Sequence, residues 1–142
     1  MIQRIQSLWL LLAAVAMFLA LKLPFAVAKS LESGNTKDIT VDEYLIAFLI
    51  AILLSVGSLV IIFLFKRRSN QKRLIWLGIL TSVLFIVLMY FHVEEYKTND
   101  NNITASFSIG AVFPIVYIIF MAMAYAGVRR DEKLIRSIER LR

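Results

Sequence analysis

The chain of 142 residues has no cysteine, a single histidine, two prolines and five glycines. Without cysteine it cannot form disulfides, iron–sulfur clusters or thiolate zinc sites, and it has no thiol nucleophile. It also lacks a glycine-rich phosphate loop, a Ser/His/Asp set and an H-E-x-x-H motif. We therefore expect no enzymatic activity, no cofactor and no bound metal.

Charged residues are also scarce, at 18% of the chain, whereas hydrophobic residues make up 60% and the mean hydropathy is +0.77. An ordinary soluble domain is at most about half apolar. Four apolar stretches each approach the ~20 residues that a helix needs to cross the hydrocarbon core. The sequence predicts one all-α domain over residues 1–142, a four-helix transmembrane bundle with helices at about 5–28, 41–65, 71–95 and 107–128.

Basic residues are concentrated in the N-terminus, the connection between the second and third helices, and the C-terminal tail. These segments hold twelve Lys and Arg against three Asp and Glu, a net charge of +9, whereas the other two connections hold four against seven, a net charge of −3. The positive-inside rule then places both termini in the cytoplasm. Topology explains most of the basic residues, so we expect no nucleic-acid partner. The basic residues of the cytoplasmic segments are Arg4, Lys66, Arg67, Arg68, Lys72, Arg73, Arg129, Arg130, Lys133, Arg136, Arg140 and Arg142.

The N-terminal segment is similar to a secretory signal, with Arg4, an apolar run and the small residues Ala26 and Ala28 spaced as in a cleavage site. Lys22, however, stands where a signal is neutral. We expect the segment to be retained as the first transmembrane helix, with Lys22 reaching the outer interface.

Thr40 and Glu43 form a capping-box pattern, which predicts the start of the second helix. An alternative is that Asp42 and Glu43 bind a cation. His92 with Glu94 and Glu95 is a similarly weak metal pattern, because zinc sites use three or four ligands from His, Cys and carboxylates. One His with flanking carboxylates at a water interface is more often a solvated helix end, which is what we expect here.

Small residues recur at four-residue spacing in each helix, which favours close helix packing in a bilayer. We expect these faces to meet inside the bundle, and Pro114 to kink the fourth helix in its outer third. The small-residue pairs and triplets are Ala16 and Ala20, then Ala47, Ala51 and Ser55, then Gly78 and Ser82, then Ala122 and Ala126.

Hydroxyl groups, rather than ionisable groups, occupy the predicted centre of the membrane. They either form one interhelical layer or, for Ser and Thr, bond to the carbonyl four residues earlier. The Tyr117 phenol cannot easily reach local backbone, so we expect a partner on the second or third helix. The candidate layer consists of Ser55, Ser58, Thr81, Ser82 and Tyr117.

The tail, residues 129–142, contains neither glycine nor proline and is predicted to extend the fourth helix into the cytoplasm. Its apolar residues share one face and its basic residues fill the others. Such a helix contacts a protein partner, or it lies on anionic lipid. The candidate contact residues are Arg130, Lys133, Leu134, Arg136, Ile138, Arg140 and Leu141.

Two motifs carry a resemblance to a known family: MIQRIQS at Met1–Ser7 and RDEKLIRSIERLR at Arg130–Arg142. Both resemble the ends of a family of small bacterial four-helix membrane proteins classified as a domain of unknown function. The resemblance implies a protein of the bacterial cytoplasmic membrane, and it transfers no catalytic residue.

Together these patterns predict a non-enzymatic accessory or scaffold subunit. Its expected partners are the lipid bilayer and a membrane protein, either a different protein or a second copy of the chain. The alternative is a small transporter or channel component with a polar layer at the midplane of the bilayer. No small-molecule substrate is identifiable from the sequence.

Overall fold

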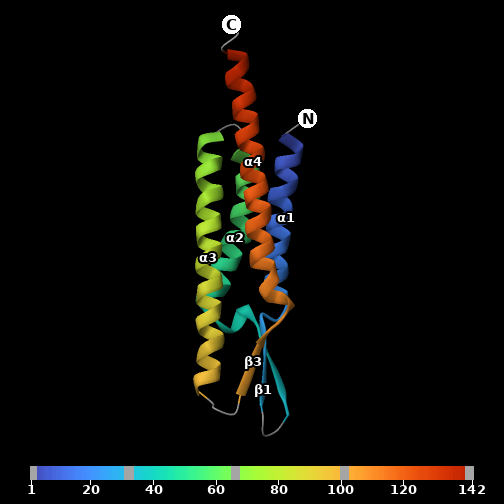
Figure 1. The fold of residues 1–142 in the computed structure, drawn as a ribbon, viewed down its shortest axis with the longest axis vertical. Helices are drawn as coiled ribbons and strands as arrows, with labels where there is room; N and C mark the ends of the chain where they lie inside the picture. Colours follow the sequence, from blue (N-terminus) through green and yellow to red (C-terminus); the bar gives the residue numbers. More distant parts are fainter. Residues whose placement is uncertain (1–2, 31–33, 65–67, 100–102, 140–142) are drawn as a thin grey trace.

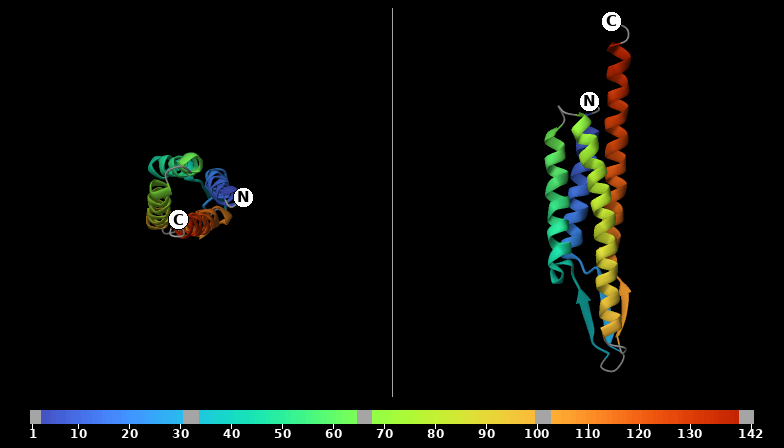
Figure 2. Two further views of the ribbon diagram at one scale, coloured as in Figure 1. Left: turned by 90° about the horizontal axis from the view of Figure 1, so that it is seen from above. Right: turned by 90° about the vertical axis from the view of Figure 1, so that its left-hand side faces the viewer.

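Four long helices make up most of the protein: α1 (Gln3–Lys22), α2 (Leu45–Phe63), α3 (Arg68–Asn99) and α4 (Phe113–Glu139). They form an up-and-down bundle (Figure 1). Seen from above, the helices follow one another around a square, and α4 closes it against α1 (Figure 2). The start of α1 and the end of α4 therefore lie on the same side of the bundle. The computed structural model describes residues 3–30, 34–64, 68–99 and 103–139.

Each helix contains a stretch long and apolar enough to cross a membrane. Only 28–39% of each stretch is buried inside the protein, and large apolar side chains such as Leu80 and Phe63 point outward. Such a surface suits lipid rather than water. The fold is that of a membrane protein with four candidate spans, as the sequence predicted.

The interior of the bundle combines small side chains with large ones such as Phe85 and Tyr117. Ala16 and Ala20 of α1, and Ala47 and Ala51 of α2, are buried as expected. The prediction for the fourth helix is wrong, because its Ala122 and Ala126 are exposed. The face of α4 that packs inward consists instead of Tyr117, Met121, Ala124 and Val128.

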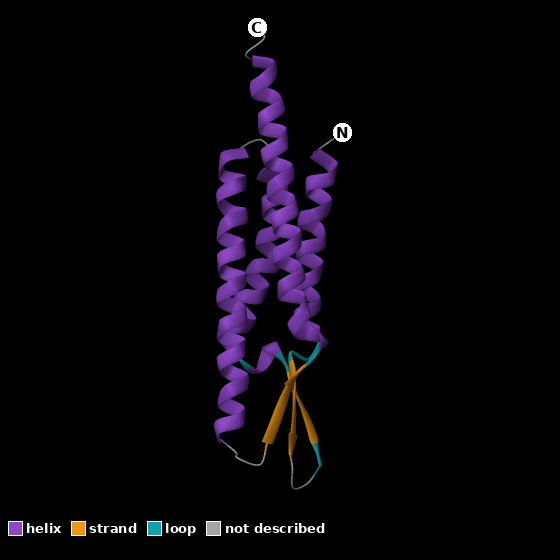
Figure 3. Cartoon of the chain, in the orientation of Figure 1, coloured by secondary structure: helices purple, strands orange, loops and turns teal. Residues whose placement is uncertain are grey.

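A small antiparallel sheet lies at the end of the bundle away from Gln3, so the all-α prediction is incomplete (Figure 3). Its strands are β1 (Ala26–Ser30), β2 (Thr36–Ile39) and β3 (Ile103–Phe107), in the order β2-β1-β3. Phe25, next to the central strand, contacts Phe85 and Phe107 edge-on, with ring centroids 6.3 and 6.0 Å apart. These contacts fasten the sheet to α3.

The first helix ends at Lys22, six residues before the predicted end. Pro24 has no backbone N–H and disfavours helical geometry at the preceding residue. The chain then enters β1, where Phe25 N donates to Ile39 O at 2.9 Å. Ala26 and Ala28, which resembled a cleavage site, are buried in the central strand.

The predicted capping box does not form. Thr40 is extended and makes no side-chain capping bond, and a short 3-10 helix, Val41–Glu43, precedes the start of α2 at Leu45. Glu43 instead contacts Lys37 and Tyr96. The carboxylate thus connects β2 to α3 and is not available for the helix start.

The kink predicted at Pro114 is also absent. Pro114 is the second residue of α4, after a 3-10 helix at Ile109–Val112, and the first turn of a helix tolerates proline. From there α4 runs for 27 residues. At this same sheet end α3 is longer than predicted and continues alongside β3.

Gly110 joins the bundle to the sheet. Its amide donates to Pro24 O at 3.0 Å, and a Cβ atom there would lie 2.4 Å from that oxygen. We predict that Gly110→Ala lowers the free energy of unfolding by about 1–3 kcal/mol, because backbone must move. SDS titration in mixed micelles measures this. Gly57→Ala is the matched control, since its Cβ would meet nothing within 4 Å; equal effects at the two glycines would contradict the prediction.

Candidate functional site

Residues from three helices meet at one point inside the bundle, and two of them carry hydroxyl groups. Tyr117 is 1% exposed, and its phenol oxygen lies 3.2 Å from the Ser58 hydroxyl oxygen of α2. Gly78 of α3 makes room, because a Cβ there would lie 3.0 Å from the phenol oxygen. The contact predicted between Tyr117 and the second helix is therefore present.

The other hydroxyls do not join this pair in a single layer. Ser55 donates to Ala14 O of α1 at 3.1 Å, and Ser82 donates to Pro114 O of α4 at 3.3 Å. Thr81 donates to Leu77 O within its own helix at 2.8 Å. Ser55 and Ser82 thus each join two helices, whereas Thr81 bonds only to its own helix. Ser58, besides its contact with Tyr117, also donates to Leu54 O of its own helix at 2.8 Å.

A cavity of about 640 Å³ opens between α1 and α2 near the sheet end. Lys22, Thr40 and Asp42 line its polar part, and Ser55 and Val56 line the part that reaches furthest along α2. Because Ser55 is about halfway along α2, the cavity covers half of the bundle's depth. A second, apolar cavity of about 330 Å³ separates α2 from α3 beside Gly57 and Gly78.

A buried polar contact that the sequence analysis missed links α1 to α4 at the opposite end. The Gln6 amide donates to Asp131 Oδ2, and both residues are 7% exposed. Gly127 provides space, since a Cβ there would lie 2.8 Å from Gln6 Cγ. The sequence offered no clear signal for this contact, because Gln6 stands beside Gln3, Arg4 and Ser7 in the polar start of α1.

An ion pair at the same end joins Lys72 of α3 to Glu132 of α4. Both side chains are about one quarter exposed. Sequence spacing alone could not pair residues 60 positions apart. This ion pair and the Gln6–Asp131 bond hold α4 between its two neighbours just before it leaves the bundle.

A polar and aromatic cluster occupies the sheet end. The Tyr96 hydroxyl donates to Glu43 Oε2 at 2.9 Å, and Lys37 Nζ lies 3.3 Å from both the phenol oxygen and Glu43 Oε1. These hydrogen bonds, first to Tyr96 and then to Glu43, raise the pKa of Lys37. His92 stacks on Tyr44 with ring centroids 4.8 Å apart. Among the described residues, no three His, Asp or Glu side chains form a metal-binding group.

The tail residues are only partly described. Arg130 and Lys133 are exposed on α4, whose backbone continues as helix to Glu139. Figure 2 shows this last part of α4 projecting beyond the other helices. The side chains of Leu134, Arg136 and Ile138, together with all of Arg140 and Leu141, lie outside the described part of the chain.

Residues 2–141 match the family described as a domain of unknown function (DUF4293), and the chain belongs to that family. The match confirms the resemblance inferred from the two ends. No curated protein and no solved structure matches the chain.

The contact between Ser58 and Tyr117 is testable by a double-mutant cycle of Ser58→Ala and Tyr117→Phe. We predict a coupling free energy of about 0.6 kcal/mol, the average for interhelical hydrogen bonds in membranes. SDS titration in mixed micelles provides the four unfolding free energies. Tyr90→Phe is the control for loss of a phenol, because Tyr90 is 48% exposed. Strictly additive effects of Ser58→Ala and Tyr117→Phe would refute the contact.

Proposed function

We propose that this protein is a non-enzymatic accessory or scaffold subunit of the bacterial cytoplasmic membrane. In this proposal its basic end faces the cytoplasm, and the tail of α4 docks a partner protein. The observation that carries the proposal is the length of α4. At the basic end it continues as helix beyond the points where α1 and α3 begin (Figure 1). A membrane crossing does not need this extension.

The direction of α4 supports docking of a protein over binding to the lipid surface. A helix that lies on the bilayer must turn from the direction of its transmembrane part. α4 instead runs without interruption from Phe113 to Glu139. Gln6–Asp131 and Lys72–Glu132 hold it on both sides near the membrane boundary. The apolar face predicted for the tail is then offered to a partner in the cytoplasm.

The environment of the hydroxyl groups supports a role without catalysis. A nucleophilic Ser or Thr needs an adjacent base, whereas Ser55, Thr81 and Ser82 donate to backbone carbonyls and Ser58 contacts Tyr117. Each of these contacts fits a role in helix packing.

The second candidate function is a transporter or channel component, and the cavity between α1 and α2 favours it. That cavity combines Lys22 and Asp42 at its polar part with Ser55 near the centre of α2. A complete pathway needs a continuation toward the basic end. The lining of the cavity ends at Ser55 and Val56, so we rank transport second.

Site-specific photo-crosslinking in the tail tests the proposed docking. We expect a photoreactive amino acid at Ile138, on the predicted apolar face, to give a discrete protein adduct in cells. The same amino acid at Arg136, about 200° away around the helix, is the matched control and should give none. Deletion of Leu134–Arg142 should remove the partner from purified complexes while membrane insertion is retained. Equal adducts at both positions, or unchanged partner recovery after the deletion, would rule out this docking mode.

A further inference from the structure

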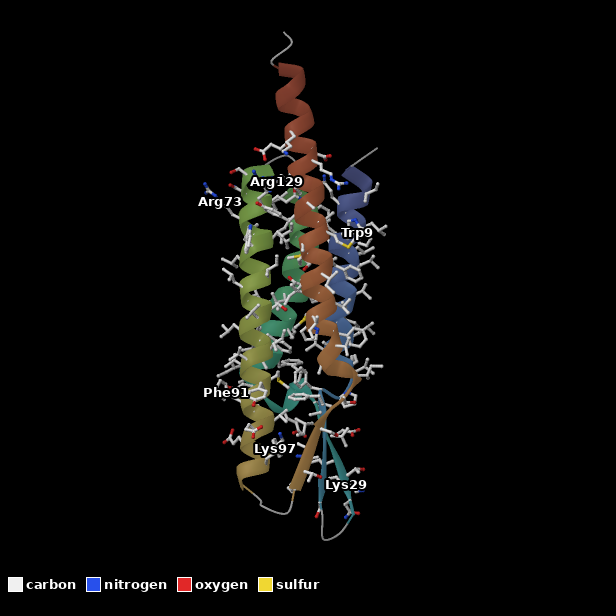
Figure 4. All side chains as sticks on the ribbon, viewed as in Figure 1. Trp9, Lys29, Arg73, Phe91, Lys97 and Arg129 are labelled. Atoms are coloured by element: carbon white, nitrogen blue, oxygen red, sulfur yellow. The ribbon has the colours of Figure 1, made fainter. Side chains whose placement is uncertain are left out.

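A groove between α3 and α4 at the basic end gathers positive charge. Lys72 and Arg73 line it from α3, and Arg129 and Lys133 line it from α4. Glu132 is its acidic member, so the five side chains carry a net charge of +3. Figure 4 shows Arg73 and Arg129 at the same end of these adjoining helices.

The four basic side chains of the groove differ in whether they form an ion pair. Glu132 forms an ion pair with Lys72. No hydrogen bond or ion pair joins Arg73, Arg129 or Lys133 to another side chain within the described residues. Asp131, the nearest other carboxylate in the sequence, is turned toward α1, where it bonds with Gln6. Within the part of the chain that the structure describes, the groove therefore holds three cations that form no ion pair with a carboxylate.

The same groove becomes apolar toward the middle of the membrane. Below the cations it is lined by Trp76, Leu77 and Leu80, which are 52%, 60% and 64% exposed. Tyr125 of α4 contacts Trp76 edge-on, with ring centroids 6.0 Å apart. Lys72 and Tyr125 line both the charged and the apolar cavities, of about 270 and 480 Å³, so the two adjoin each other.

We infer that this groove binds an anionic phospholipid from the leaflet at the basic end. The headgroup phosphate lies among Arg73, Arg129 and Lys133, and an acyl chain follows the apolar strip of α3. Lys72, Trp76 and Leu80 follow one another at four-residue spacing along one face of α3. This face is cationic near the membrane surface and apolar toward the middle, which is also the order of headgroup and acyl chain in a phospholipid. Basic pockets between transmembrane helices are suited to such headgroups.

Charge on one side of the membrane is sufficient for topology, but it does not require basic residues from two helices to line one groove. A peptide or nucleic acid in the cytoplasm can meet the cations, yet it does not reach the strip at Leu77 and Leu80. An anionic phospholipid can contact both the cations, through its phosphate, and the apolar strip, through an acyl chain. Glu132 limits the affinity, because it neutralises Lys72.

Quenching of Trp76 fluorescence by lipids with brominated acyl chains tests the inference. The chain has two tryptophans, Trp9 and Trp76. Trp9→Phe leaves Trp76 as the reporter and keeps an aromatic ring next to Phe120, on which Trp9 stacks. The full-length variant is placed in nanodiscs of phosphatidylcholine with a small fraction of phosphatidylglycerol, and one lipid at a time is brominated. We expect brominated phosphatidylglycerol to quench Trp76 more than its bulk fraction predicts.

Three single substitutions test whether the preference for phosphatidylglycerol depends on the residues that line the groove. Arg129→Gln should weaken the preference for phosphatidylglycerol about fivefold, the contribution of one basic residue near an anionic surface. Glu132→Gln should strengthen the preference, because it frees Lys72. Arg130→Gln is the matched control, since Arg130 is exposed next to Arg129 but does not line the groove.

Equal losses from Arg129→Gln and Arg130→Gln would overturn the inference, because general attraction to the surface would then explain the data. Quenching that follows the bulk lipid fraction would overturn it as well. Inorganic phosphate added at constant ionic strength should leave the preference unchanged. Loss of the preference for phosphatidylglycerol in the presence of phosphate would show that the cations bind free phosphate rather than a lipid.

Discussion

The hydrocarbon core of a bilayer contains no water, and this constraint orders the rest of the structure. Backbone groups in that region must bond within their own segment, so the four spans are helices. Lipid also removes the hydrophobic gain from pairing large side chains with one another. The helices therefore approach through Ala16, Ala20, Ala51 and Gly78, while many large apolar residues, such as Leu80 and Phe63, face outward. A few hydroxyl contacts, such as Ser58 with Tyr117, supplement this packing.

The two ends of the bundle meet water in different ways. At one end, irregular backbone is organised into a sheet that pairs β1 with both β2 and β3 and packs Phe25 against α3. At the other end, α4 leaves the bundle as a free helix, held by Gln6–Asp131 and Lys72–Glu132. The sheet end carries paired strands and the cavity between α1 and α2, whereas the basic end presents an extended helix and a charged groove. The proposed docking and the proposed lipid site both lie at the basic end.

Hydrophobic length and loop charge were sufficient to predict the four helices, because both are properties of single segments. Burial of Ala47, Ala51 and Tyr117 also followed from spacing and chemistry. The sheet was not predictable in this way, since α2 and α3 separate Ala26 from its partner Phe107 in the sequence and β2 is short and polar. The Lys72–Glu132 pair likewise depends on how α3 and α4 pack. Ala122 and Ala126 show that spacing alone does not fix which face of a helix turns inward.

The central claim is that the basic end, with its tail and its groove, lies in the cytoplasm. The absence of native cysteine permits a direct measurement with single-cysteine variants. Asn35→Cys, at the sheet end, and Ser69→Cys, at the basic end, replace exposed residues. In intact bacterial cells, a membrane-impermeant maleimide should label Asn35→Cys and should label Ser69→Cys only after the cells are opened. Labelling of Ser69→Cys in intact cells, with Asn35→Cys protected, would contradict the account.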